Sequence, residues 1–275
     1  CETLSAGQRA ALSVSIGHDD IARGDWLGAA KRSVIRIDTH LTLLDSAAPL
    51  KSGVDYHLYI GAAHRLARVR KLDENASLYQ LSLDEPIACH WGDRFIIRDP
   101  AAKFSLGGGK VIDTEVPKRG RASPERLALL RAYQNESRAA IEAALAVAPY
   151  GIALEQFALV RNLAPAAIDA CLEQARQQSP APIEVPIDGA RFPRLFGAPV
   201  ADSLTVRLTD VLQNFHAEQP SEAGLLESAI ARALQPSVPA PVLAGFIATL
   251  LSKGSLRREG GFVALATHHA QVSKE

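Results

Sequence analysis

The chain contains no methionine and only three cysteines among its 275 residues. Cys1, Cys89 and Cys171 lie far apart and form no Cys-x-x-Cys pair, which argues against a disulfide framework and against a structural zinc site. This usage fits a reducing, cytoplasmic compartment. Because a complete reading frame starts with methionine, the cysteine at position 1 indicates a fragment of a longer protein.

An excess of charge of one sign and long apolar runs are also lacking. Basic and acidic residues number 30 each, so nucleic-acid binding would have to come from local patches and not from a global field. No apolar run approaches the roughly 20 residues that a membrane helix needs. Residues 1–30 alternate in polarity, whereas a signal peptide would form one apolar block.

Motifs for nucleotide, metal and catalytic chemistry are missing as well. The glycines at 107–109 are not a phosphate-binding P-loop, because no glycine precedes them at the required spacing and Val111 follows Lys110. His57 and His64 have no carboxylate or cysteine nearby to complete a ligand set, so no metal is expected. The chain is therefore predicted to be no enzyme and to hold no cofactor of its own.

Residues 1–117 have the pattern of β-structure. The segment 92–99, followed by the glycines 107–109, predicts a strand, a polar loop at 99–105 and a second strand whose bare backbone a large partner could approach closely. Such short strands with turns between them predict antiparallel barrels. Four further segments alternate apolar and polar residues with the period of a half-buried strand: 10–16, 34–41, 56–60 and 78–83.

The pattern changes at the basic linker 116–121 and becomes helical. Ser123-Pro124-Glu125 is typical of a helix start, with an N-cap serine, proline at the first position and an acid in the first turn. One order of elements, helix, helix, helix and hairpin, occurs twice and predicts tandem winged-helix modules. The first copy comprises 125–148, 153–161, 165–177 and a strand pair, 183–187 and 191–195, that turns at Asp188-Gly189. The second comprises 203–218, 222–234, 241–253 and the hairpin 256–265.

Several of these runs resemble elongation factor Tu-like translation factors, and most of all the selenocysteine-specific elongation factors of bacteria. The runs are Ala6-Gly7-Gln8-Arg9, Arg23-Gly24-Asp25-Trp26-Leu27, 56–64, 92–99 and 107–112. The resemblance covers essentially the whole chain and implies a multidomain fold, in which β-barrel domains precede two α+β winged-helix domains. It implies these parts: the end of the second, tRNA-binding barrel domain (1–28), the third barrel domain (29–117), two winged-helix domains (118–200 and 201–269) and a tail (270–275).

The resemblance further implies a factor that delivers selenocysteinyl-tRNA to the ribosome at a recoded UGA codon. In this family an N-terminal domain binds GTP and Mg²⁺ and hydrolyses the nucleotide, and the last winged helices bind a hairpin of the selenoprotein mRNA. Both parts are expected to lie outside this chain. What remains is expected to contact tRNA, to link to the hairpin reader and to be monomeric, away from membranes.

Site residues are assigned by the same resemblance. Arg23 matches the position that contacts the 5′ end of the acceptor arm, and its guanidinium suits a phosphate. Arg9 matches the pocket for the aminoacyl group, although a surface arginine on a strand explains it equally well. Small residues and cations near the hairpin are expected to meet the tRNA backbone: Arg98, Lys103, Ser105, Gly107, Gly108, Gly109 and Lys110. Further candidates for RNA contact lie in the linker and the last hairpin: Arg119, Arg121, Lys253, Arg257 and Arg258.

The alternative is a DNA-binding regulator that fuses a β-barrel sensor to tandem winged helices. Winged helices usually read DNA through the third helix. Here the third helices are poor candidates, since 164–177 carries Asp169 and Glu173 beside a single Arg176, and 241–253 is apolar until Lys253.

Overall fold

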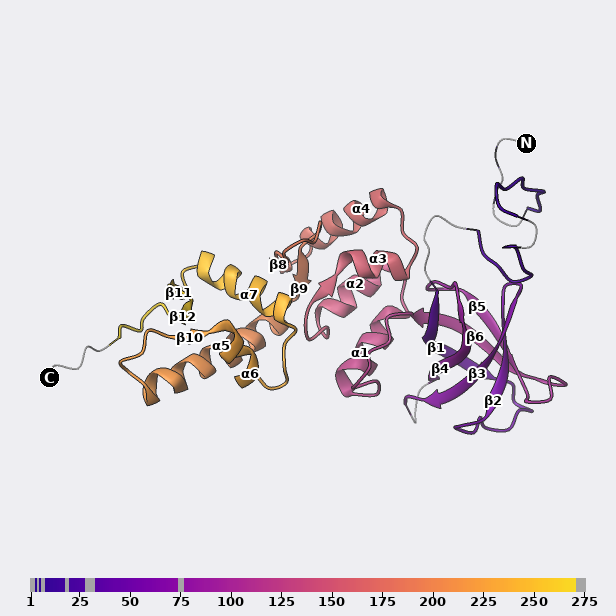
Figure 1. Ribbon diagram of the computed structural model, residues 1–275, viewed down its shortest axis with the longest axis horizontal. Helices are drawn as coiled ribbons and strands as arrows, with labels where there is room; N and C mark the ends of the chain where they lie inside the picture. The colour runs from indigo at the N-terminus through magenta and orange to yellow at the C-terminus, as the bar shows by residue number, and fades with distance from the viewer. Residues whose placement is uncertain are drawn as a thin grey trace.

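The structure is a computed structural model that describes residues 3, 5, 8–17, 20–27, 33–73 and 77–270. A β-barrel and two winged-helix modules follow one another along the long axis of the molecule (Figure 1). Each part has a buried apolar cluster, and further clusters join neighbouring parts.

Six antiparallel strands close the barrel in the order β1-β4-β3-β2-β5-β6. The segments predicted at 34–41, 56–60 and 78–83 are confirmed as parts of β1, β2 and β4, and both strands of the hairpin after residue 92 are present. Alternation places one face of each strand in the core; Leu58 and Ile97, for example, are fully buried. The strands are β1 (Val34–Leu43), β2 (Asp55–Ile60), β3 (Ala63–Lys71), β4 (Leu78–Ile87), β5 (Arg94–Arg98) and β6 (Ser105–Asp113).

The strand predicted at 10–16 is wrong. This segment is irregular, and its alternating Leu12, Val14 and Ile16 are 63%, 38% and 52% exposed. A strand needs a neighbour for its backbone N–H and C=O groups, and none of the described segments pairs with this one. Alternation alone therefore does not produce a strand here.

The two winged-helix modules repeat one topology, and the predicted tandem is confirmed. Each has a three-stranded sheet in which the last strand of the hairpin lies in the middle, in the orders β7-β9-β8 and β10-β12-β11. The first module comprises α1 (Pro124–Tyr133), α2 (Ser137–Leu145), β7 (Ile152–Ala153), α3 (Leu154–Val160), α4 (Pro165–Arg176), β8 (Ile183–Val185) and β9 (Arg194–Phe196). The second comprises α5 (Ala198–Glu218), β10 (Leu225–Leu226), α6 (Glu227–Ala233), α7 (Ala240–Ser252), β11 (Leu256–Glu259) and β12 (Phe262–Leu265).

The single helix predicted over 125–148 is two helices. The start is as predicted, since Ser123 Oγ accepts the N–H of Arg126 and Pro124 follows the cap. In a continuous helix the carbonyl of Tyr133 would accept from the N–H of residue 137. It accepts instead from the side chains of Trp91 and Arg161. Partners from elsewhere in the fold thus end α1 at this point.

The tight turn predicted at Asp188-Gly189 is also wrong in extent. Val185 pairs with Arg194, so the connection spans residues 186–193. Phe192 within it is buried, and its N–H donates to Glu155 at 2.8 Å. The connection is long because it docks on neighbouring helices.

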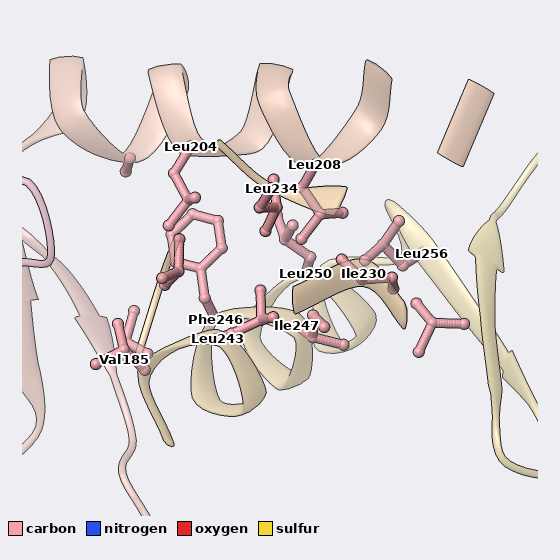
Figure 2. Packing of buried hydrophobic residues seen from close by; sticks show 14 of the residues in the cluster. Val185, Leu204, Leu208, Ile230, Leu234, Leu243, Phe246, Ile247, Leu250 and Leu256 are labelled. Atoms are coloured by element: carbon pink, nitrogen blue, oxygen red, sulfur yellow. The ribbon is translucent and has the colours of Figure 1, made fainter. Parts of the chain in front are cut away.

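One buried cluster joins the two winged-helix modules. Val185 of β8 and Phe196 of β9 pack with the residues of α5 and α7, and the rings of Phe196 and Phe246 are 5.4 Å apart. Figure 2 shows Leu204 and Leu208 of α5 pointing toward Phe246 and its neighbours on α7. A Cβ on Gly245 of α7 would lie 2.2 Å from the carbonyl oxygen of Pro186, so the backbones of the two modules approach closely here.

A buried ion triad joins the barrel to α1. Arg126 donates to the carboxylates of Asp38 on β1 and Asp113 on β6, the latter at 2.9 Å. Gln80 of β4 donates to Asp38 and accepts from Arg121 of the linker. All three strands are thereby tied to the start of the first module.

A second contact joins the barrel to α3. Trp91, in the loop before β5, donates its backbone N–H to the carbonyl of Val160 and its indole N–H to that of Tyr133, both at 2.7 Å. The guanidinium of Arg161 lies 4.1 Å from the centre of the Trp91 ring, within cation–π range. No local pattern predicts either junction, because both depend on residues far apart in the chain.

Candidate RNA-binding surface

The β5–β6 hairpin carries a row of basic side chains on the outside of the barrel. Arg94 on β5 is the register partner of Lys110 on β6, and Lys110 is also the partner of His40 on β1. Register partners project from the same face of a sheet. The three residues therefore form one row across β5, β6 and β1, and Arg94 and Lys110 are exposed.

One position without a side chain lies beside this row. Gly108 is the register partner of Ile96 on β5 and of Thr42 on β1. Ile96 is 51% exposed, so this position belongs to the outer surface. The outer residues of these strands form what we call the hairpin face: His40, Thr42, Arg94, Ile96, Gly108 and Lys110.

The hairpin face contains two basic residues that the sequence prediction missed, Arg94 and His40. The alternation of Arg94, Phe95 and Ile96 could have placed Arg94 outside, because Phe95 is clearly a core residue. His40 carried no such signal, since only the pairing of β1 with β6 brings it next to Lys110.

The three glycines of β6 are required for different structural reasons. A Cβ on Gly109 would lie 2.0 Å from the carbonyl oxygen of His40, and one on Gly107 would lie 2.3 Å from that of Thr42. The sequence predicts that RNA approaches the bare backbone of all three glycines. At Gly107 and Gly109, however, it is the neighbouring strand β1 that lies close to the backbone. Gly108 alone belongs to the hairpin face, where a Cβ would lie 2.9 Å from the carbonyl oxygen of Phe95.

The loop between β5 and β6 is held by Asp99. Its carboxylate accepts the N–H of Phe104 at 2.5 Å and that of Ala101 at 3.2 Å. The bond from Phe104 is the main reason why the pKa of Asp99 lies below its ordinary value. The loop so fixed exposes Lys103 and Phe104, the latter by 70%. Lys103 is thus presented at the end of the hairpin.

Arg98 lies next to a stack of rings on β2 and β3. Its terminal nitrogen donates to the carbonyl of Lys103 at 3.1 Å, and its guanidinium is 5.9 Å from the centre of the Tyr59 ring. Tyr59 stacks on His64, which stacks on His57 with a 2.7 Å contact between ring nitrogens. Nowhere in the described ranges do three His, Cys, Asp or Glu side chains gather as a metal site would require.

Arg9 and Arg23 precede the barrel strands in the sequence and do not belong to the hairpin face. Arg23 is exposed in a turn at Ala22–Asp25, where Asp25 accepts the N–H of Ala22 at 2.7 Å. Gly24 follows it with φ +106° and packs on Ala63, as a bend in the chain requires. Arg9 is exposed, while Ala6 and Gly7 of its motif lie outside the described residues.

The remaining candidates differ in how free their charges are. Arg121 donates to Gln80, and both arginines of the last hairpin are paired, Arg257 with Glu259 at 2.7 Å and Arg258 with Glu227. Arg119 and Lys253 are exposed and form no ion pair with any described residue. Of the five, these two can meet a phosphate without losing an existing partner.

The third helices of the two modules offer no cationic surface for DNA. Arg176, the single arginine of α4, donates to both carboxylate oxygens of Glu184 and to Glu173. On α7 the residues from Val242 to Leu250 include five that are buried in the core. A duplex would therefore meet neutral or acidic helices, which counts against the DNA-binding alternative.

Two family models match the chain. The beta-barrel domain of selenocysteine-specific elongation factors matches residues 37–118, and the winged helix of elongation factor SelB matches residues 209–265. These two ranges carry domains of selenocysteine-specific elongation factors. The hairpin face lies within the first matched range, on the barrel of this family.

Curated relatives extend the match to nearly the whole chain. The selenocysteine-specific elongation factor of Escherichia coli K12 is 27% identical over 282 residues, which cover 100% of this chain and 43% of the relative. That of Haemophilus influenzae is 23% identical over 279 residues, covering 98% and 43%. The chain thus spans less than half the length of these relatives.

A solved structure supports the fold. The crystal structure of a bacterial selenocysteine-specific elongation factor, EF-Sec, superposes with a TM-score of 0.57 at 16% identity, over 85% of this chain and 34% of that one. At this identity the likeness concerns the fold alone. Separately, none of the helices in the described ranges combines the length and the apolar character needed to span a membrane.

Proposed function

We propose that this chain is the tRNA-contacting and linking part of a selenocysteine-specific elongation factor. The observation that carries the proposal is the row of Arg94, Lys110 and His40 beside the bare position at Gly108, with Lys103 at the end of the same hairpin. The ligand is selenocysteinyl-tRNA, and the setting is its delivery to the ribosome at a recoded UGA codon.

The chemistry of the hairpin face suits an RNA backbone better than RNA bases. Lysine and arginine neutralise phosphates and release counterions, and a surface without side chains lets the sugar–phosphate chain approach main-chain groups. Such contacts position a helix of RNA but carry little sequence information. Selectivity among tRNAs would then come from shape and from contacts such as that of Arg23 at the acceptor end.

The activity of the whole protein extends beyond this chain. We place the binding of GTP and Mg²⁺ on an N-terminal domain and the binding of the mRNA hairpin on later winged helices, neither of them part of these residues. The chain itself would not hydrolyse GTP. Its winged-helix modules would hold the hairpin reader at a set position relative to the tRNA, in a monomeric cytoplasmic protein.

Binding of two tRNAs by the 275-residue chain tests this function. Labelled selenocysteine-specific tRNA and a bulk elongator tRNA are titrated in parallel, and the first should bind more tightly. Charge reversal by Lys103→Glu or Arg94→Glu should weaken that binding about tenfold through lost phosphate contacts. Arg70→Glu, at an exposed arginine on β3, is the matched control and should change little. Equal, weak binding of both tRNAs, or equal effects of all three variants, would contradict the proposal.

A further inference from the structure

A cleft of about 630 Å³ lies where the barrel and the two winged-helix modules meet. Asp113 at the end of β6, Tyr133 of α1, Phe157 of α3 and Pro236 of the second module all line it. Its volume falls within the roughly 300–1,000 Å³ of small-molecule sites, which occur preferentially between domains. No residue of the hairpin face lines this cleft, so it is a separate feature of the molecule.

Arg194 is half-buried in the cleft and poorly satisfied. Its Nε donates to the carbonyl of Gly151 at the long distance of 3.5 Å. Its two terminal nitrogens form no hydrogen bond or ion pair with any residue that the structure describes. Burial lowers the pKa of Arg194, which measures the loss of hydration. A half-buried guanidinium keeps donors free for further acceptors, and a ligand with acceptor oxygens can supply them.

Tyr133 adds a second donor to the same cleft. Its backbone carbonyl is engaged by Trp91 and Arg161, but its hydroxyl has no hydrogen-bond partner among the described residues. Burial is the main cause that raises the pKa of Tyr133 far above its ordinary value, so the hydroxyl keeps its proton. Tyr133 and Arg194 both line this cleft.

The remaining lining suits a flat apolar body with a negative charge. The ring of Phe157 lies edge-on to that of Tyr133 at 5.7 Å, and Leu129, Pro149 and Pro236 add apolar surface. The charged lining comprises four arginines (Arg119, Arg126, Arg161, Arg194) and three carboxylates (Asp113, Glu115, Glu125). Asp113 is already paired with Arg126.

We propose that this cleft binds a small organic anion, in which a phosphate or carboxylate group is held by Arg194 and Tyr133 and an apolar ring packs against Leu129, Pro149 and Pro236. Such a ligand would touch the barrel and both modules at once and would stabilise their mutual arrangement. The site does not depend on the tRNA-binding role of the hairpin face.

Calorimetric titration of the 275-residue chain tests the site with two anions and their uncharged counterparts. Adenosine 5′-monophosphate carries the phosphate and 2-naphthoate the carboxylate; adenosine and 2-naphthamide lack the charge. At least one anion should bind with a Kd below about 1 mM, and at least tenfold more tightly than its counterpart. Which anion binds identifies the preferred group. Binding of neither anion, or equal binding of anion and counterpart, would overturn the proposal.

Three variants locate the binding. Arg194→Gln removes the charge and keeps a polar side chain, and Tyr133→Phe removes only the hydroxyl. Each should weaken binding of the anion about tenfold, since a charge-assisted hydrogen bond is lost. Arg191→Gln removes an exposed arginine that lies just before β9 and does not line the cleft, and it should leave the affinity unchanged. Urea midpoints confirm that each variant is folded. Unchanged affinity in both cleft variants would show that the anion binds elsewhere and contradict the assignment.

Discussion

At the scale of single residues, close packing between strands explains two of the three glycines on β6. Gly107 and Gly109 lie so near the carbonyl groups of β1 that a methyl group has no room. Gly108 faces outward between Ile96 and Thr42, where the constraint is milder. The glycine triplet thus allows close strand packing at Gly107 and Gly109 and contributes to the candidate RNA surface at Gly108.

Alanine substitutions separate these two uses. Gly109→Ala should lower the free energy of unfolding by about 3 kcal/mol, because its Cβ would lie 2.0 Å from a carbonyl oxygen that belongs to a paired strand. Gly108→Ala should cost only about 1 kcal/mol, since a shift of a few tenths of an ångström relieves its contact. Urea denaturation of the two variants provides the comparison. Equal costs at both positions would show that this packing argument is wrong.

Residue-level prediction from the sequence succeeded where the signal was local. The cap at Ser123 and the polar loop after Arg98 follow from a few neighbouring residues, and the structure has both. The reason for Gly109 and the place of His40 depend on the pairing of β6 with β1. That pairing joins segments about 70 residues apart and leaves no local pattern in the sequence.

At the scale of elements, the start of α1 is fastened to the barrel by a single arginine between two carboxylates. Arg126 has one positive charge, whereas Asp38 and Asp113 would together carry two negative charges in a buried site. Burial is the main cause that raises the pKa of Asp113 from 3.8 to about 6, and the Arg126 guanidinium opposes it. Asp113 therefore binds its proton more tightly in the folded state than in the unfolded state.

This linkage predicts how the stability of the junction depends on pH. The stability that the Asp113 proton contributes is complete below pH 3.8 and is lost as the pH rises through about 6. Asp113→Asn cannot lose a proton, so its stability relative to the wild type should improve by up to about 3 kcal/mol between pH 4 and pH 7. Urea midpoints of both proteins across this range give the measurement. A difference that stays constant with pH would contradict the raised pKa.

Helix boundaries show what element-level prediction could reach. Helical patterning predicts every long helix, yet it predicts one helix over 125–148 where the structure has α1 and α2. The break arises from Trp91 and Arg161, which take the carbonyl that the helix would have used. The opposite error occurred at 10–16, where a good strand pattern has no described partner strand. In both cases tertiary contacts decide the outcome.

At the scale of the whole molecule, the three parts are joined by buried contacts and not by open linkers. The Arg126 triad and Trp91 connect the barrel to the first module, and the cluster around Phe196 and Phe246 connects the two modules (Figures 1 and 2). Buried contacts of this kind hold the barrel and the two modules at fixed positions relative to one another. This property suits the proposed link between a tRNA-binding barrel and a more distant reader of mRNA.

The salt dependence of binding tests most directly whether tRNA phosphates contact the β5–β6 hairpin. The affinity of the chain for selenocysteine-specific tRNA is measured over a series of salt concentrations, for the wild type and for Lys103→Ala. Each lost phosphate contact should reduce the slope of log affinity against log salt by about one, so the variant should show a slope shallower by that amount. A slope identical to that of the wild type would mean that Lys103 meets no phosphate, and would contradict the placement of RNA on this side of the barrel.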